Sequence, residues 1–313
     1  MSASRRPALR FRRAFAIVAL SKPTLKPTQG SPMKLLRYGP PGKEKPGLVD
    51  ANGRIRSLAK KIKDITPDTF APATLAKLKK IKPESLPLVS GKPRLGIPFT
   101  GISKIIAVGL NYADHAAEAG LAIPKEPVLF TKAITSLNGP NDKVKLPRGS
   151  VKGDWEVELG IVIGRKAQYV SEDDALRYVA GYCLVNDVSE REYQIERGGQ
   201  WMKGKSCDTF CPTGPWLVTA DEIKDPQNLK MWLKVNGETK QNSSTKQMIF
   251  GVKKLVSYIS QFITLMPGDL IPTGTPPGVG LGHKPTPVFL KAGDVMELGM
   301  DGLGTQRQQV VGS

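Results

Sequence analysis

The chain has 313 residues, 40% of them hydrophobic, which is enough for a full core and suits one large domain with a smaller appendage. Its formal net charge of +18 would suit a nucleic-acid- or membrane-binding protein. The basic residues, however, lack the interleaved aromatics or helix-turn-helix pattern of nucleic-acid binders, and no stretch is long enough to span a bilayer. These properties are typical of an ordinary soluble protein, whose charge could draw in anionic substrates.

The first 32 residues carry seven Arg or Lys and no acidic residue. We interpret residues 1–32 as a disordered extension or an upstream start, with Met33 beginning the folded chain. Two alternatives stay open. The pair Arg12-Arg13 before a short apolar run resembles a twin-arginine export signal, and the acid-free composition resembles an organelle transit peptide.

Residues 33–98 are expected to form a small N-terminal domain. Its expected elements, in chain order, are strands at 34–38, 47–50 and 54–57, then a Lys-rich amphipathic segment at 75–81 and a Pro-rich linker. The lysines between residues 60 and 82 are interpreted as a solvated face.

Residues 99–313 are expected to form the larger domain. Gly and Pro are plentiful and helical periodicity is scarce, so we expect many short strands joined by turns. Expected elements are a strand at 105–109, helices at 112–120, 171–178 and 253–263, and a loop at 271–282, with Ser171 capping the second helix. Three cysteines without a CxxC spacing indicate buried thiols in a reducing compartment, so we expect a cytoplasmic protein.

A pair of acidic residues, Glu156 and Glu158, is the strongest sign of function. A strand has a period of two, so both carboxylates share one face, opposite apolar residues. Burying two repelling carboxylates without a counter-ion costs several kcal/mol. A third carboxylate, Asp187, ends another apolar run. Oxygen ligands alone favour Mg²⁺, Mn²⁺ or Ca²⁺ over Zn²⁺. The alternative is that both glutamates lie on the solvated face of an edge strand.

His115 and Glu118 form a second candidate group. An i, i+3 spacing on a helix brings the two side chains together, and a carboxylate beside an imidazole raises its basicity. Such a pair could take a proton from water. The alternative is a surface histidine on a short helix.

Further polar residues could recognise an anionic substrate. Arg191 and Gln194 lie one helical turn apart, and Lys205 lies in a glycine-flanked segment where it could also balance developing negative charge. Gly274 and Thr275 begin a Gly/Pro segment whose backbone N–H groups could face an anion. Singly, these are ordinary surface polar residues and turn residues.

Several of these segments occur together, in order, between about residues 104 and 311, and together they resemble the fumarylacetoacetate hydrolase family. The motifs are Gly-Leu-Asn-Tyr-Ala-Asp-His at 109–115, Asp-Trp-Glu-Val-Glu-Leu at 154–159, Asn-Asp at 186–187, Lys-Gly-Lys-Ser at 203–206 and Gly-Thr-Pro-Pro-Gly-Val-Gly at 274–280. The resemblance implies a β-rich α+β fold, a mixed β-sandwich roll with a small N-terminal α/β domain, and a homodimer.

The resemblance also implies a site and a reaction. Glu156, Glu158 and Asp187 would bind Mg²⁺ or Mn²⁺, and His115 with Glu118 would activate water. Water would attack C4 of a 2,4-diketo acid, the C3–C4 bond would break, and the metal and Lys205 would hold the enolate that becomes pyruvate.

The expected activity is therefore hydrolysis of an acylpyruvate-type substrate, such as a 2,4-diketo-3-deoxy-L-fuconate or L-rhamnonate. The expected partner is a small anionic diketo acid, with neither nucleic acid nor membrane. Oxaloacetate decarboxylation and isomerisation of an unsaturated diacid remain alternatives on the same kind of site. From other classes, a basic nucleic-acid-binding protein and a metal-binding structural module remain alternatives.

Overall fold

The structure is a computed structural model that describes residues 33–114 and 122–313. Its larger sheet has nine strands in the order β3-β2-β1-β13-β10-β9-β16-β4-β5. Their bounds are Lys34–Tyr38 (β1), Lys45–Val49 (β2), Ile55–Ser57 (β3), Ile105–Gly109 (β4), Val128–Lys132 (β5), Val157–Ile163 (β9), Val179–Asn186 (β10), Leu217–Thr219 (β13) and Leu270–Pro272 (β16). Among the described strands of this sheet, only the pair β16–β4 is parallel.

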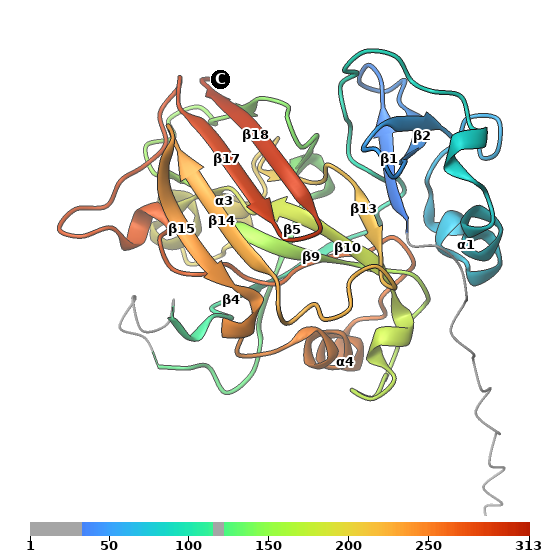
Figure 1. Cartoon of the computed structure of the whole chain (residues 1–313). Coiled ribbons are helices and arrows are strands. Elements are labelled where there is room, and N and C mark those ends of the chain that lie inside the picture. Colours follow the sequence, from blue (N-terminus) through green and yellow to red (C-terminus); the bar gives the residue numbers. More distant parts are fainter. Residues whose placement is uncertain (1–32, 115–121) are drawn as a thin grey trace, which may run out of the picture.

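A five-stranded sheet in the order β15-β14-β17-β18-β7 lies against β9 and β10 (Figure 1). Its strands are Val144–Lys145 (β7), Lys230–Val235 (β14), Glu238–Ser244 (β15), Val295–Met300 (β17) and Gly304–Val311 (β18). Two short ladders complete the strands: Leu137–Asn138 (β6) with Cys211–Pro212 (β12), and Gly153–Asp154 (β8) with Ser189–Glu190 (β11).

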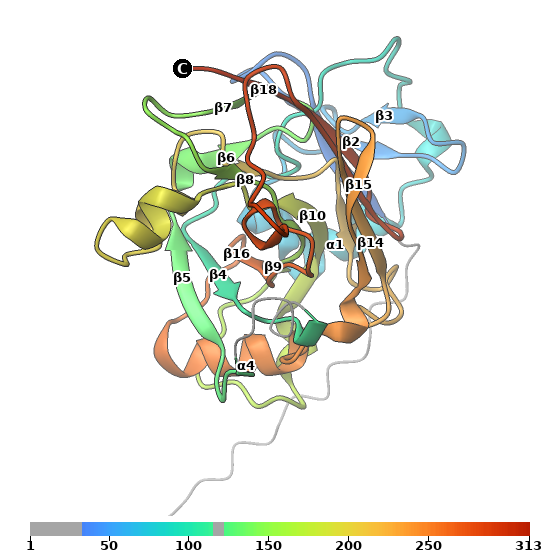
Figure 2. The same ribbon diagram turned by 90° about the vertical axis from the view of Figure 1, so that its left-hand side faces the viewer.

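The described helices are few and short. They are Pro72–Lys79 (α1), Met202–Lys205 (α3) and Val252–Phe262 (α4), with single turns at Pro67–Phe70 (η1), Pro83–Ser85 (η2), Ile134–Ser136 (η3), Ala175–Tyr178 (η4), Glu192–Glu196 (η5), Thr245–Gln247 (η6) and Gly280–Gly282 (η7). Figure 2 shows α4 lying below the sheets. None of the helices in the described part of the chain has the length and apolar character needed to cross a bilayer. The β-rich α+β class expected from the sequence is confirmed.

The main core lies between the two sheets, and β9 shows why it forms. Val157, Leu159 and Ile161 alternate along β9 and pack into this core with Leu233 of β14 and Leu298 of β17. The intervening residues point to the other side of the larger sheet, where Val162 joins a second core cluster. β9 is therefore buried on both faces, and Glu158 lies on the face away from the main core.

The N-terminal residues extend the same larger sheet. β1 pairs with β13, with Lys34 opposite Val218, and Leu35 packs into the second core cluster together with Val185 of β10. In Figure 1 the blue strands of this region lie beside β13. The division of the chain into domains at residues 33–98 and 99–313 stays a prediction.

Several local expectations need correction. The segment 171–178 is a turn followed by the 3₁₀ helix η4, although the backbone N–H of Asp174 does donate to Ser171. The expected loop 271–282 begins only after β16. Lys79 is buried in an ion pair with Asp221 (2.6 Å) and not solvated.

The cysteines agree with the expectation in part. All three are free thiols, and Cys183 and Cys211 are buried, but Cys207 is half-exposed. The strands at 34–38 and 105–109 are confirmed, and the helix expected at 253–263 is α4.

Candidate active site

Strand pairing brings the three candidate metal-binding carboxylates together. β9 and β10 are antiparallel, with Val157 opposite Asn186, so the start of β9 meets the end of β10. The backbone N–H of Asp187 donates to the carbonyl of Glu156 (2.9 Å), which continues the ladder by one residue. Cross-strand neighbours share a face of a sheet, as do residues two apart in one strand. Glu156, Glu158 and Asp187 therefore converge, with one oxygen of each within 4.8 Å of the others.

These carboxylates are buried, so the solvated edge-strand alternative is wrong. Glu158 is 1% exposed and Asp187 is fully buried. Three cationic side chains, Lys132, Arg191 and Lys205, pair with the acids in this region. Protein cations therefore already supply part of the counter-charge that the sequence alone would assign to a metal ion.

Lys205 reaches the acids because α3 packs tightly against β11 and η5, which precede it in the chain. A Cβ on Gly204 would lie 2.3 Å from the carbonyl oxygen of Glu190, so the glycine permits this close approach. The Lys205 ammonium lies 2.7 Å from Glu156 and 2.9 Å from Asp187. Burial would lower the pKa of Lys205, but Asp187 and Glu156 raise it, so the ammonium stays charged.

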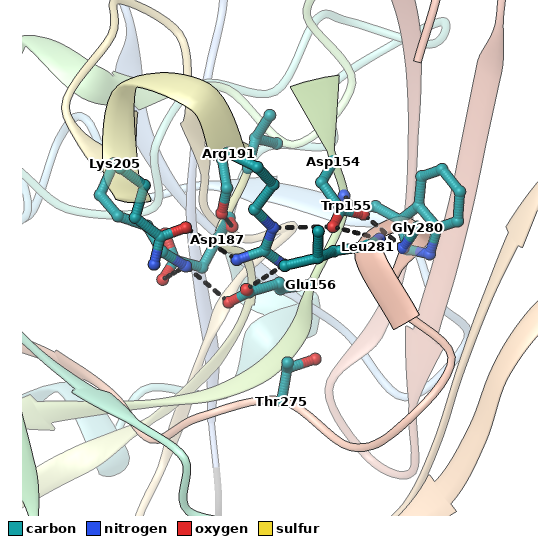
Figure 3. A network of polar contacts seen from close by, with 12 residues as sticks. Asp154, Trp155, Glu156, Asp187, Arg191, Lys205, Thr275, Gly280 and Leu281 are labelled. Carbon is teal, nitrogen blue, oxygen red and sulfur yellow. Dashed lines mark hydrogen bonds and ion pairs between the residues drawn. The ribbon is translucent and has the colours of Figure 1, made fainter. Parts of the chain in front are cut away.

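Arg191 links Glu156 to a fourth buried carboxylate, Asp154. The ladder between β8 and β11 pairs Ser189 with Asp154 and so places Arg191 nearby. Figure 3 shows the Arg191 guanidinium between Asp154 (2.8 Å) and Glu156 (2.7 Å). It also donates to Gln194 Oε1 (2.9 Å). Arg191 and Gln194 are therefore together, as their spacing predicts, but Arg191 is engaged by protein carboxylates.

The Gly/Pro segment binds protein carboxylates through its backbone. Gly274 donates its N–H to Glu158 Oε2 (2.8 Å), and Gly280 donates to Asp154 (2.6 Å). The Thr275 hydroxyl donates to the Val157 carbonyl (3.0 Å). We expected this segment to bind an anion through its backbone. The anion that Gly274 binds is the carboxylate of Glu158, a candidate metal ligand. Thr275 lines the adjoining cavity.

The protonation states of the two glutamates differ for a physical reason. Burial alone would raise the pKa of Glu156, but Lys205 and Arg191 lower it to about 2. Burial, Asp187 and Glu156 together raise the pKa of Glu158 well above its ordinary value. Of the two glutamates, Glu158 is therefore the one whose pKa favours keeping a proton.

The donor set suits a hard divalent cation. Oε1 of Glu158 is buried and has no hydrogen-bond partner among the described residues. A buried carboxylate oxygen without a hydrogen-bond partner is rare and indicates that a ligand or ion binds there. Oxygens from three carboxylates are ligands that Mg²⁺, Mn²⁺ and Ca²⁺ accept. The expected acidic triad is present and could hold such an ion.

A cavity of ≈350 Å³ opens over Glu156 and Glu158. Glu156, Glu158, Arg191 and Lys205 contribute to its lining, as do Gln194 and Thr275. The remaining wall is formed mainly by apolar side chains from β4, β5, η5, the residue before α3 and the segment after β16. The cavity thus combines a charged base with an apolar wall, as small-molecule sites commonly do.

Two expected catalytic residues, His115 and Glu118, lie outside the described residues. Tyr112, just before them, is buried and pairs with Met248, and Ala113 and Asp114 begin a helical turn. The helix expected at 112–120 can be followed no further.

Two buried charged residues escaped the sequence reasoning. Lys132 ends β5 and lies 2.5 Å from Asp187, and Asp154 holds Arg191 together with the segment after β16. Lys132 has no local signal, because one lysine at a strand end is ordinary. Asp154 lies two residues before Glu156, and this proximity was a usable signal.

Comparison with known proteins shows which family the chain belongs to. Residues 104–311 match the family model described as fumarylacetoacetate hydrolase C-terminal. The chain belongs to the fumarylacetoacetate hydrolase family. A Burkholderia cenocepacia protein named "Putative hydrolase" is 61% identical over 276 residues, covering 88% of this chain and 98% of the relative.

Two solved structures show how the family fold is shared. The fumarylacetoacetate hydrolase of Exiguobacterium antarcticum is 35% identical with a TM-score of 0.80, and the match covers 90% of this chain and 100% of the other. A 2-hydroxyhepta-2,4-diene-1,7-dioate isomerase from Mycobacterium marinum is 33% identical with a TM-score of 0.69, over 90% and 99% of the two chains. The fold is therefore of the fumarylacetoacetate hydrolase type, and family members with it include hydrolases and isomerases.

Proposed function

We propose that this protein is a divalent-metal-dependent hydrolase that cleaves the C3–C4 bond of an acylpyruvate-type 2,4-diketo acid. The products are pyruvate and a carboxylic acid. The observation that carries the proposal is the buried convergence of Glu156, Glu158 and Asp187, of which both glutamates line the cavity, with one Glu158 oxygen lacking a partner among the described residues.

The cation is proposed to be Mg²⁺ or Mn²⁺, held by these three carboxylates. When bound, it would orient the substrate carboxylate and 2-oxo oxygen and stabilise negative charge at that oxygen. The region holds four carboxylates, including Asp154, against three cationic side chains. A bound divalent cation would make the net charge of this region positive. A positive region favours an anionic substrate.

The chain's own residues have distinct proposed roles. Lys205 keeps its charge and lies at the cavity, where it can hold the oxygen that becomes negative. His115 and Glu118 are proposed to take a proton from water, whose oxygen then adds to C4. The C3–C4 electron pair passes to C3, which is protonated to give pyruvate. Arg191, Gln194, Gly274 and Thr275 are proposed to shape substrate binding, Arg191 and Gly274 by holding the acids.

The test is pyruvate release from a panel of acylpyruvates, 2,4-diketo-3-deoxy sugar acids and oxaloacetate. We expect release from diketo acids that EDTA abolishes and Mg²⁺ or Mn²⁺ restores. His115→Ala should abolish turnover but retain Mg²⁺ binding by calorimetry, whereas Glu156→Ala should lose both. Unchanged turnover in His115→Ala would refute the role assigned to it, and pyruvate released only from oxaloacetate would favour a decarboxylase.

An isomerase is the second candidate, because the Mycobacterium marinum neighbour bears that name and shares the fold. An isomerase would shift the double bond of an unsaturated diacid without releasing pyruvate. Following its ultraviolet absorbance beside pyruvate release separates the two activities.

The remaining parts of the proposal concern the setting of the enzyme. We expect a cytoplasmic homodimer that binds neither nucleic acid nor membrane. Light scattering after gel filtration tests whether the protein is a dimer. A duplex-DNA titration at low salt tests whether its positive charge leads to DNA binding. Tight, steeply salt-dependent DNA binding that persists in Glu156→Ala would instead favour a nucleic-acid-binding protein.

A further inference from the structure

The cavity is larger than its charged base requires. Its ≈350 Å³ is more than ten times the liquid volume of a water molecule, about 30 Å³. The acids, Lys205 and a bound cation address only the carboxylate and 2-oxo end of a diketo acid. The rest of the substrate must therefore meet the other walls of the cavity.

One of these walls is built from aromatic rings. The Phe130 ring lies 5.1 Å from the Lys205 ammonium and 5.3 Å from the Trp201 ring, so the wall begins directly beside the charged base. Trp201 packs against β4 at Gly109, where a Cβ would lie only 2.4 Å from the indole. Gly109 thus makes room for the indole, and the wall runs from Lys205 to β4.

The rest of the lining includes the polar side chains of Gln194, Thr275 and Lys284 as well as further apolar residues. Ile195 follows Gln194, and Val279 and Leu281 come from the segment after β16. Ile195 is 50% exposed and Leu281 38% exposed, so an apolar ligand could still remove much of their surface from water. The polar Thr275 already donates to Val157 and accepts from Gln241, so it does not depend on a ligand hydroxyl.

We propose that the acyl group of the substrate is apolar, an alkyl or aryl group that packs between the Phe130–Trp201 wall and Leu281. This rests on the proposed function and narrows its substrate class. A polyhydroxylated sugar-acid chain would have to lose water from its hydroxyls against these side chains without replacement hydrogen bonds. Sugar acids are therefore poor substrates on this proposal.

Kinetics on a graded panel test the proposal. We expect kcat/KM to rise at least about tenfold from acetylpyruvate to hexanoylpyruvate or benzoylpyruvate, and to be lowest for a 2,4-diketo-3-deoxy sugar acid. Leu281→Asn and Ile195→Asn should each lower the ratio of kcat/KM for hexanoylpyruvate over acetylpyruvate about tenfold. Leu88→Asn changes a 53% exposed leucine outside the cavity lining and should leave the ratio unchanged. A sugar acid as the best substrate would overturn the proposal while leaving the hydrolase assignment intact.

A binding measurement keeps the two proposals separable. Calorimetry with Mg²⁺ present compares 2-oxooctanoate, pyruvate and 2-oxogluconate, none of which has a cleavable 2,4-diketone. We expect 2-oxooctanoate to bind at least tenfold more tightly than either of the others. If no diketo acid is hydrolysed, the proposed function fails, but this titration still decides the polarity of the wall. Equal affinities, or a preference for 2-oxogluconate, would overturn the apolar assignment.

Discussion

At the scale of single residues, the site is a balance of buried charges. Glu156, paired with Lys205 and Arg191, is ionised, whereas Glu158 accepts only the Gly274 N–H among the described residues and has a raised pKa. The pKa values of two carboxylates two residues apart thus shift in opposite directions because their partners differ. A cation that replaced the Glu158 proton would supply the partner that its Oε1 lacks.

The raised pKa of Glu158 predicts a pH dependence of stability. The folded protein holds this proton more tightly than the unfolded chain, so the contribution is full below pH about 4.5 and is lost as pH rises through the folded pKa. In EDTA, the free energy of unfolding should fall more steeply with pH in the wild type than in Glu158→Gln. Urea unfolding between pH about 5 and 8 measures this, with exposed Glu84→Gln as control. Equal slopes in wild type and Glu158→Gln would contradict it.

Lys132 is predicted to offset the charge of Asp187. Lys132→Met leaves this buried carboxylate with one cationic partner fewer, which should lower the free energy of unfolding by about 3–5 kcal/mol in EDTA. Added Mg²⁺ should raise the melting temperature of this variant more than that of the wild type, because the cation replaces the missing charge. Thermal unfolding with and without Mg²⁺ checks this. The exposed Lys166→Met should behave as wild type.

At the scale of elements, the segment after β16 shapes the site because it packs closely on its neighbours. Gly278 has φ +97°, and a Cβ there would lie 1.9 Å from the carbonyl oxygen of Lys240 in β15. Its own carbonyl accepts the indole N–H of Trp155 (3.0 Å). Such contacts hold the segment where its N–H groups reach Glu158 and Asp154.

Gly278→Ala should therefore displace this segment, and Gly293→Ala is its matched control. Gly293 also has a positive φ (+102°), but a Cβ there would have nothing within 4 Å. Both variants share the cost of a left-handed alanine, and only Gly278→Ala adds the clash. We expect it to be about 2 kcal/mol less stable than Gly293→Ala by urea unfolding, with a lower turnover. Equal stabilities would show that the clash relaxes freely.

At the scale of the whole molecule, the N-terminal strands and the site share one sheet. β1 is hydrogen-bonded to β13, which adjoins β10, and β10 leads directly to Asp187. Leu35 of β1 is fully buried in a cluster that also contains Val162 of β9. The N-terminal region should therefore unfold together with the strands that carry the acids.

Leu35→Ala tests this coupling, because all four tryptophans lie between residues 155 and 232. Loss of the buried side chain should lower the stability by about 2–5 kcal/mol, and tryptophan fluorescence should report the loss in full. Circular dichroism should give the same midpoint in one transition. Leu88→Ala, at an exposed position, is the control. An unshifted fluorescence midpoint would mean that the two regions unfold separately.

The amino-acid sequence by itself determined the features that depend on neighbours along the chain. Alternation in β9 placed Glu156 and Glu158 on one face, and apolar periodicity marked α4, because both signals arise within a few residues. The ordered motifs also indicated the family and, through it, the β-rich fold. The helix expected at 171–178 was wrong. The Ser171 cap is a local signal, whereas this stretch packs against α4 and forms a turn followed by η4.

Only the tertiary structure decided which charges meet. The β9–β10 register sets Asp187 opposite Glu156, the β8–β11 ladder brings Arg191 to Asp154, and Lys132 arrives from the far edge of the same sheet. Strand partners and register depend on contacts between residues distant in the chain, which no local pattern encodes. For the same reason the sequence indicated Arg191 and Lys205 as candidate site residues but gave no sign of Lys132 beside Asp187.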